Sequence, residues 1–261
     1  MEQFLAWTAW GMEKPTAYGP FHLTFLIGGL SLCLLAALLL RRVGNKANNV
    51  ILLSAGGFLL VSEIYKQLFY TFYIGQGEYQ WWIFPFQLCS VPMYLCLILP
   101  FIRSERVKRP FYTFLATFNL LGGFISMFEP SGLSHEYVTL TLHAFLWHLL
   151  LVFIGFYLIA SDRAARSFKE YLPAVGVFGG LCALAQIFNV IFRDKDFKMF
   201  YISPFHTTPI VVFKQIEQAT TWWVNMIVYL FALCLGAFAF LSIGIGLKKL
   251  CRHIAAKRKI A

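Results

Sequence analysis

The main pattern along the chain is a series of long apolar stretches separated by short polar segments. A membrane-spanning helix needs about 20 apolar residues at about 1.5 Å each. Seven stretches reach that length, and none shows the alternation of a membrane strand, so helices are expected. They are 21–40, 50–74, 82–102, 110–128, 137–160, 171–192 and 221–247. The pattern predicts an all-α, polytopic bundle of seven transmembrane helices.

The segments outside these stretches predict accessory elements of a single domain, 1–261, because the chain has no internal repeat or low-complexity segment. The first segment lacks a basic region and a cleavage site, so it does not read as a signal peptide. Its aromatic residues Phe4, Trp7 and Trp10 favour the membrane interface instead. The expected elements are an interfacial segment (1–20), an exterior lid-like loop (193–220) and a basic cytoplasmic tail (248–261).

Composition supports the membrane assignment and excludes a soluble fold. Hydrophobic residues make up 59% of the chain and charged residues 13%, whereas soluble domains carry about 25% charged residues. Of the 22 Lys and Arg residues, 16 lie after the first, third and fifth stretches or in the tail, and five lie in the opposite segments. The positive-inside rule therefore predicts a cytoplasmic C-terminus and an exterior N-terminus in the cell membrane.

The same charge distribution bears on partners and cofactors. The net charge of +10 is spread over juxtamembrane loops, where anionic lipid headgroups attract it, so we expect membrane phospholipids and no nucleic acid as partners. The six cysteines form no C-x-x-C pair and none lies in an exterior segment, so no disulfide framework is expected. No metal or nucleotide motif is present, and we expect no metal and no cofactor.

Polar residues inside the predicted spans concentrate in their outer halves. Ionisable residues within a membrane are expensive and often functional, and their common depth predicts a polar pocket. Each residue alone has a structural interpretation: a cysteine can be a small filler, an asparagine can join helices, and Glu63 and Lys66 have the spacing of an ion pair. The residues at this depth are Glu63, Lys66, Cys89, Asn119, His143, His148, Gln186, Asn189 and Asn225.

The stretch "FPFQLCSVPMYL" interrupts an otherwise apolar span. It places Gln87, Cys89 and Ser90 between Pro85 and Pro92. A regular helix that begins at Pro85 would leave the free N–H groups of its first turn just above Cys89, where they favour a thiolate and bind an oxyanion. A thiol, a histidine base and such amides form an arrangement for covalent acyl transfer, with Gln87 and Ser90 lining the pocket.

Two motifs in this region resemble a known family. They are "FPFQLCSVPMYL" and "LHAFLWHLLLVFIGFYL" (142–158), and the chain resembles the bacterial YwaF-like integral membrane proteins, whose animal relatives are the transmembrane protein 164 acyltransferases. The shared pattern is P-x-x-L-C at the third span, then a histidine nine residues before an aromatic-Leu pair, here Tyr157 and Leu158. The stretch 188–205 resembles the family's loop after the sixth span, with Asn189 at its Asn position.

The resemblance implies a membrane-embedded Cys/His acyltransferase that moves phospholipid acyl chains through a thioester acyl-enzyme. It implies Cys89 as the nucleophile, and its spacing selects His148 as the base, whereas depth in the membrane slightly favours His143. An acyl hydrolase would use the same site with water as the acceptor.

Two other classes of function remain open. In a transporter, Glu63, Lys66 and the histidines would line a path, although the inner halves of the spans are nearly free of polar residues and no inverted repeat is visible. A non-catalytic receptor or assembly protein is the third class. An acylatable thiol at Cys89 would separate the enzyme from both, and the oligomeric state is not predicted.

Overall fold

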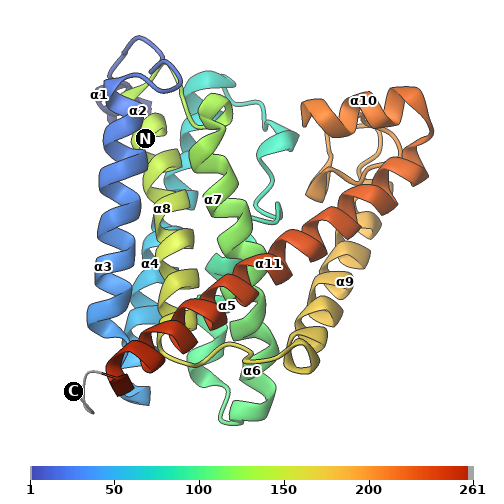
Figure 1. The fold of residues 1–261 in the computed structure, drawn as a ribbon. Coiled ribbons are helices and arrows are strands. Elements are labelled where there is room, and N and C mark those ends of the chain that lie inside the picture. Colours follow the sequence, from blue (N-terminus) through green and yellow to red (C-terminus); the bar gives the residue numbers. More distant parts are fainter. Residues whose placement is uncertain (1, 258–261) are drawn as a thin grey trace.

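The structure is a computed structural model that describes residues 2–257, and these residues form an all-helical bundle with one isolated β-bridge between Gly11 and Tyr137. Within the described residues, six helices are long and apolar enough to cross a membrane. They are Pro20–Leu40 (α2 Pro20–Leu23, a π-helical turn and α3 Leu30–Leu40), Asn45–Ile74 (α4 Asn45–Leu68 and a π-helical turn), Glu105–Phe128 (α6 Glu105–Phe114, a π-helical turn and α7 Leu120–Phe128), α8 (Val138–Ala160), α9 (Phe168–Ile191) and Trp222–Leu250 within α11 (Trp222–Lys257). Figure 1 shows α11 running obliquely across the bundle.

The predicted third span, 82–102, is not one continuous helix. A short 3₁₀ turn, Trp81–Ile83, leads into a non-helical stretch, and α5 (Val91–Ile98) follows with a further 3₁₀ turn, Leu99–Phe101. Regular helix therefore begins at Val91 and not at Pro85 as predicted. The reason lies at the second proline: Pro92 has no N–H to donate to the Leu88 carbonyl, so a helix cannot run through it unbroken, whereas proline is tolerated in the first turn, where α5 places it.

The non-helical stretch 84–90 is half-buried, and side chains of neighbouring helices bond to its backbone. Irregular backbone at membrane depth is tolerated when protein groups satisfy its polar atoms. Two side chains donate to carbonyls of this stretch: Tyr94 to that of Pro85 (2.7 Å) and Trp147 to that of Cys89 (2.9 Å). Gln67 donates to the carbonyl of the preceding residue, Ile83 (2.7 Å). Helices α4 and α8 therefore fix the position of the break.

Helix α8 is the central element of the bundle and packs against α3, α4 and α7. About half of the residues in an 18-residue apolar stretch of α8 are buried. Gly155 lets α7 approach closely, since a Cβ there would lie 2.6 Å from the Leu120 Cβ. On the far side of α7, Phe118 stacks on Phe178 of α9 with ring centroids 4.4 Å apart. This packing holds the two histidines of α8 in a rigid frame.

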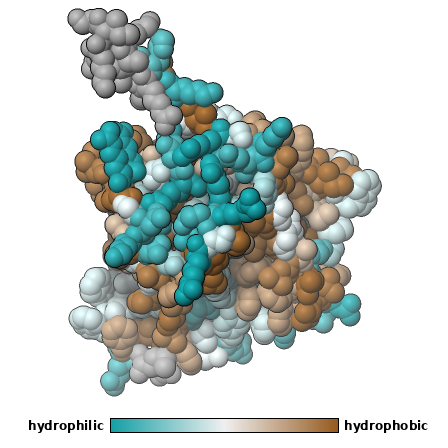
Figure 2. Space-filling model, turned by 90° about the horizontal axis from the view of Figure 1, so that it is seen from below, coloured by the Kyte–Doolittle hydropathy of each residue, from teal (hydrophilic) through white to brown (hydrophobic). Residues whose placement is uncertain are grey.

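The accessory segments are helical in part. The first segment forms α1 (Glu2–Thr8), whose Leu5 is buried while Trp7 is 69% exposed. The segment 193–220 contains a 3₁₀ turn (Met199–Tyr201) and α10 (Val211–Ala219), which is nine residues long and packs on α11 through Phe213 and Tyr229. The predicted tail lies partly outside the described residues. Seen from below, hydrophilic side chains gather on the face formed by the lower loops (Figure 2).

Candidate functional site

Cys89 lies at the end of the non-helical stretch, directly before the N-cap residue of α5, Ser90. Its side chain is half-buried. Trp147 of α8 donates its indole N–H to the Cys89 carbonyl at 2.9 Å. A cysteine inside a regular helix would have its backbone in the helical ladder, whereas this one sits where the chain is open at the positive end of a helix.

Glu63 and Lys66 form an ion pair on α4, with Lys66 Nζ 2.9 Å from Glu63 Oε1. Gln67 donates to the same oxygen at 2.7 Å. Glu63 is 3% exposed, and its second oxygen, Oε2, is buried without a hydrogen-bond partner among the described residues. Gln67 also donates to the Ile83 carbonyl at 2.7 Å, so it links the ion pair to the start of the stretch that carries Cys89.

The two predicted histidines occupy different faces of α8. They are five residues apart, which separates them by about 140° around a helix of 3.6 residues per turn. His148 Nδ1 lies 2.8 Å from the Ala144 carbonyl, and because a carbonyl only accepts, Nδ1 carries the proton and the neutral ring has its lone pair on Nε2. His143 packs against Trp147 and its Nδ1 is buried without a partner among the described residues. Lys66 interacts electrostatically with both rings.

Gln87 and Asn189 form hydrogen bonds with one short stretch of the loop after α9. Gln87 accepts from the Phe200 N–H (2.9 Å) and donates to the Lys198 carbonyl (3.2 Å). Asn189 accepts from the Met199 N–H (2.7 Å) and donates to the Met199 carbonyl (3.1 Å). Four hydrogen bonds from two side-chain amides therefore attach the turn at 198–200 to the segment that carries the cysteine.

The other predicted pocket residues join structural elements. Asn119 links α7 to α8 through the Leu151 carbonyl at 3.0 Å. Gln186 accepts from Asn189 at 3.4 Å, and Asn225 of α11 donates to Glu217 of α10 at 3.2 Å. These contacts match the interhelical role that polar residues often have in membranes.

The sequence did not predict four residues of the region that contains Cys89: Gln67, Trp147, Tyr201 and Tyr229. Gln67 and Trp147 bond the Glu63 carboxylate and the Cys89 carbonyl, as described above. Tyr201 and Tyr229 both interact electrostatically with the Cys89 thiol. Gln67 could have been found one helical turn after Glu63, but nothing in the sequence marks the two tyrosines, because the fold brings them in from distant segments.

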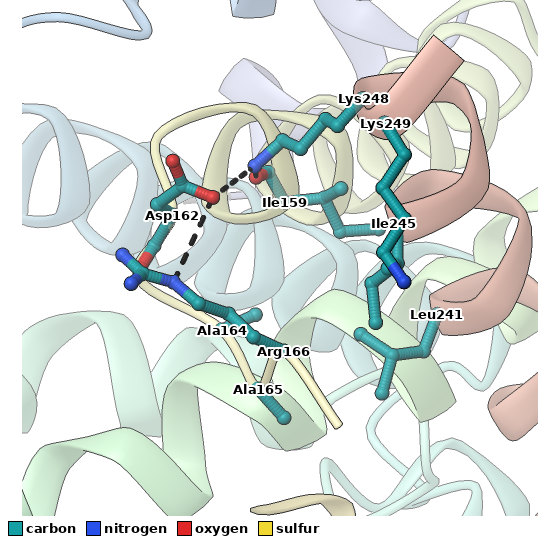
Figure 3. A pocket seen from close by; sticks show the side chains of 9 residues that line it. All are labelled: Ile159, Asp162, Ala164, Ala165, Arg166, Leu241, Ile245, Lys248 and Lys249. Carbon is teal, nitrogen blue, oxygen red and sulfur yellow. Dashed lines mark hydrogen bonds and ion pairs between the residues drawn. The ribbon is translucent and has the colours of Figure 1, made fainter. Parts of the chain in front are cut away.

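The lower end of the bundle has a separate polar cluster around a small cavity of about 120 Å³. Figure 3 shows Lys248 of α11 reaching the turn after α8, where it contacts the Ile159 carbonyl and lies 2.6 Å from Asp162 Oδ1. Arg166 Nε is 3.8 Å from the same carboxylate oxygen. The cluster ties α11 to the α8–α9 turn, which accounts for its charges structurally. The described residues contain no group of three His, Cys, Asp or Glu side chains placed to hold a metal.

Comparison with known proteins identifies a family. No curated protein and no solved structure matches the chain. The sequence model of the TMEM164 family matches residues 17–242, which include the region from α2 to most of α11. The predicted relation to transmembrane protein 164 is confirmed, while no match bears on the YwaF-like name. Because the match covers most of its length, the chain belongs to the TMEM164 family.

Proposed function

We propose that the protein is an acyltransferase of the cell membrane in which Cys89 attacks phospholipid esters and His148 is the base. The observation that carries this proposal is the position of Cys89: it lies at a break in a membrane segment, before a helix N-terminus, in a stretch that Gln67 links to the Glu63–Lys66 ion pair. A filler cysteine needs none of these surroundings. Cys96, buried within α5, shows that structural alternative in the same segment.

The proposed chemistry is an ordinary nucleophilic sequence. His148 Nε2 has a free lone pair because Nδ1–H is held by the Ala144 carbonyl, so it takes the Cys89 proton. The thiolate then attacks the ester carbonyl, a C–S bond forms, and the C–O bond to the glycerol oxygen breaks as His148 returns the proton to that oxygen. The products are a thioester on Cys89 and a lysophospholipid.

The second half of the cycle reverses these steps with another acceptor. The hydroxyl of a lysophospholipid gives its proton to His148 and attacks the thioester, which restores the thiol and forms a new phospholipid. Water in place of the lysophospholipid would make the protein a hydrolase. Lys66, held by Glu63 at 2.9 Å, would supply positive charge for the developing oxyanion.

For topology we propose seven crossings, with the broken segment 81–101 as the third and the N-terminus outside. The site then lies in the outer half of the membrane, and the whole chain, 1–261, is one domain. The loop 193–220 would act as an exterior lid, since its first part is gripped by Gln87 and Asn189 and its last part packs on α11. A reporter fused after Ala261 should be active only if it works in the cytoplasm, and an exterior reporter active there would overturn the orientation.

The proposed chemistry is tested by trapping the acyl-enzyme. Purified protein in detergent is incubated with phosphatidylcholine that carries a radiolabelled acyl chain, and the protein is digested and mapped. We expect hydroxylamine-labile label on Cys89, none in Cys89→Ala, and normal label in the matched variant Cys96→Ala. Label that never appears on Cys89, or lipid turnover that survives Cys89→Ala, would show that this proposal is wrong.

A further inference from the structure

The turn gripped by Gln87 and Asn189 has an unusual backbone. Phe200 and Tyr201 are consecutive non-glycine residues in the left-handed region, with φ values of 55° and 58°. Each such residue costs on the order of 1 kcal/mol and persists only where the surroundings hold it. The hydrogen bonds from the Gln87 and Asn189 side-chain amides to residues 198–200 hold the turn in this conformation. We call these four hydrogen bonds the clamp. Because the strained turn ends at Tyr201, the clamp fixes the backbone from which this side chain projects.

The clamp also couples Tyr201 to the cysteine. Gln87 lies two residues before Cys89 on the same non-helical stretch, and its amide accepts from the Phe200 N–H directly before Tyr201. Phe86, next to Gln87, stacks on Phe200 with centroids 5.6 Å apart and an interplanar angle of 14°. The thiol and the tyrosine are therefore carried by two backbone segments that are bonded to each other.

Two tyrosines, Tyr201 in this turn and Tyr229 on α11, have hydroxyls that bond no other group among the described residues. Neither Tyr201 nor Tyr229 makes a hydroxyl hydrogen bond within the described part of the chain, although the Tyr229 side chain is only 7% exposed. A tyrosine hydroxyl that bonds no protein group keeps its proton for a bound molecule. Trp222 of α11 donates its indole N–H to the Ile202 carbonyl at 3.2 Å, so the helix that carries Tyr229 is bonded to the turn that carries Tyr201. The two donors are thus available to a molecule bound at the cysteine.

We propose that the hydroxyls of Tyr201 and Tyr229 donate hydrogen bonds to the carbonyl oxygen of the ester that Cys89 attacks. This assignment rests on the proposed acyl transfer and adds to it the groups that stabilise the oxyanion. When the C–S bond forms, the C=O π electrons move to oxygen, and two neutral O–H donors stabilise that charge without losing their protons. The charge returns to the carbonyl as the C–O bond to the glycerol oxygen breaks, and His148 protonates the leaving oxygen.

The first test compares Tyr201→Phe and Tyr229→Phe with the wild-type protein in the phosphatidylcholine labelling reaction. Removing one oxyanion donor lowers kcat by about 100-fold or more, so we expect that loss with KM little changed. The matched control is Tyr112→Phe, which removes the hydroxyl of a buried tyrosine bonded to Asn48 in α4, and it should keep the wild-type rate. If wild-type protein acylates Cys89 and both site variants do so at the wild-type rate, the tyrosine assignment alone is wrong.

A second test does not depend on turnover. A long-chain acyl chloromethyl ketone alkylates Cys89 with loss of chloride, and donors at its carbonyl oxygen accelerate the reaction, whereas iodoacetamide reports thiol reactivity alone. We expect both tyrosine variants to react more slowly with the ketone and equally fast with iodoacetamide. If wild-type protein forms no acyl-enzyme, the proposed function fails, and the ketone still decides the tyrosine assignment. Equal ketone rates in all variants, or no ketone reaction at Cys89, overturn it.

Discussion

Two pairs of buried tyrosines in this protein differ in how their hydroxyls are used. Tyr112 and Tyr157 close on Asn48: the Asn48 amide donates to the Tyr112 hydroxyl at 3.2 Å, and the Tyr157 hydroxyl donates to the amide oxygen at 2.9 Å. Tyr201 and Tyr229, beside Cys89, have hydroxyls without partners among the described residues. The first pair joins α4, α6 and α8, whereas the hydroxyls of the second pair bond no other described residue.

The contrast separates polar groups that build the bundle from polar groups that await a ligand. A buried network whose members are all satisfied rigidifies a fold, whereas a polar group without a protein partner can bond a ligand. The Cys89 region has further open atoms, Glu63 Oε2 and His143 Nδ1. Substitutions in the open region should therefore change activity, and substitutions in the closed network should change stability.

The largest effect is expected at the ion pair of the open region. Removing one partner of a buried pair costs about 3–5 kcal/mol, because the other charge stays behind unpaired, and the partial exposure of Lys66 places the expected loss at the lower end. Glu63→Gln or Lys66→Met should therefore lower the folded yield in detergent more than the double variant does. The measurement is monodisperse protein per cell by size exclusion. Strictly additive losses would show that the two residues are not partners.

The next largest effect is on the rate of acyl transfer, and it distinguishes the two histidines. His148 has a defined tautomer with its lone pair on Nε2, so His148→Ala should lose at least about 100-fold in acyl transfer, the scale of a general base. His143 packs on Trp147, and His143→Ala should lose less. Rates are compared per folded molecule. A larger loss in His143→Ala would reverse the assignment and make His143 the base.

Much of the bundle follows from the sequence, because a membrane helix has a strong local signature. Six of the seven predicted spans are long apolar helices within a few residues of the expected bounds. The break before Val91 was only partly predictable, since the prolines announce an interruption but not the side chains from α4 and α8 that stabilise it. Tyr201 and Tyr229 were not predictable at all, because their proximity to Cys89 depends on how the loop after α9 folds back.

A smaller effect tests the tyrosine comparison directly. Tyr157→Phe leaves the Asn48 amide oxygen without its donor, so it should destabilise the protein by about 1–3 kcal/mol, the cost of an unsatisfied buried group. Tyr229→Phe removes a hydroxyl that has no described partner, and it should leave the melting temperature unchanged or raise it. Melting in detergent by tryptophan fluorescence gives both values. Equal losses in the two variants would mean that the Tyr229 hydroxyl is as well satisfied as that of Tyr157.

The smallest effect is a pH dependence that arises at His135, in the turn between α7 and α8. Burial, followed by the positive charges of Lys14 and Lys66, lowers the pKa of His135 below its ordinary value of 6.5. The unfolded chain therefore binds a proton near pH 6.5 that the folded chain does not yet bind, so stability falls as the pH drops below about 6.5 and is full above it. One proton changes the free energy of unfolding by at most about 1.4 kcal/mol per pH unit. Melting curves between pH 7.5 and 5 should show a shallower decline in His135→Gln than in the wild type, since glutamine cannot titrate and still accepts from the nearby Tyr70 hydroxyl. Parallel declines in the two proteins would place the pH sensitivity in other groups.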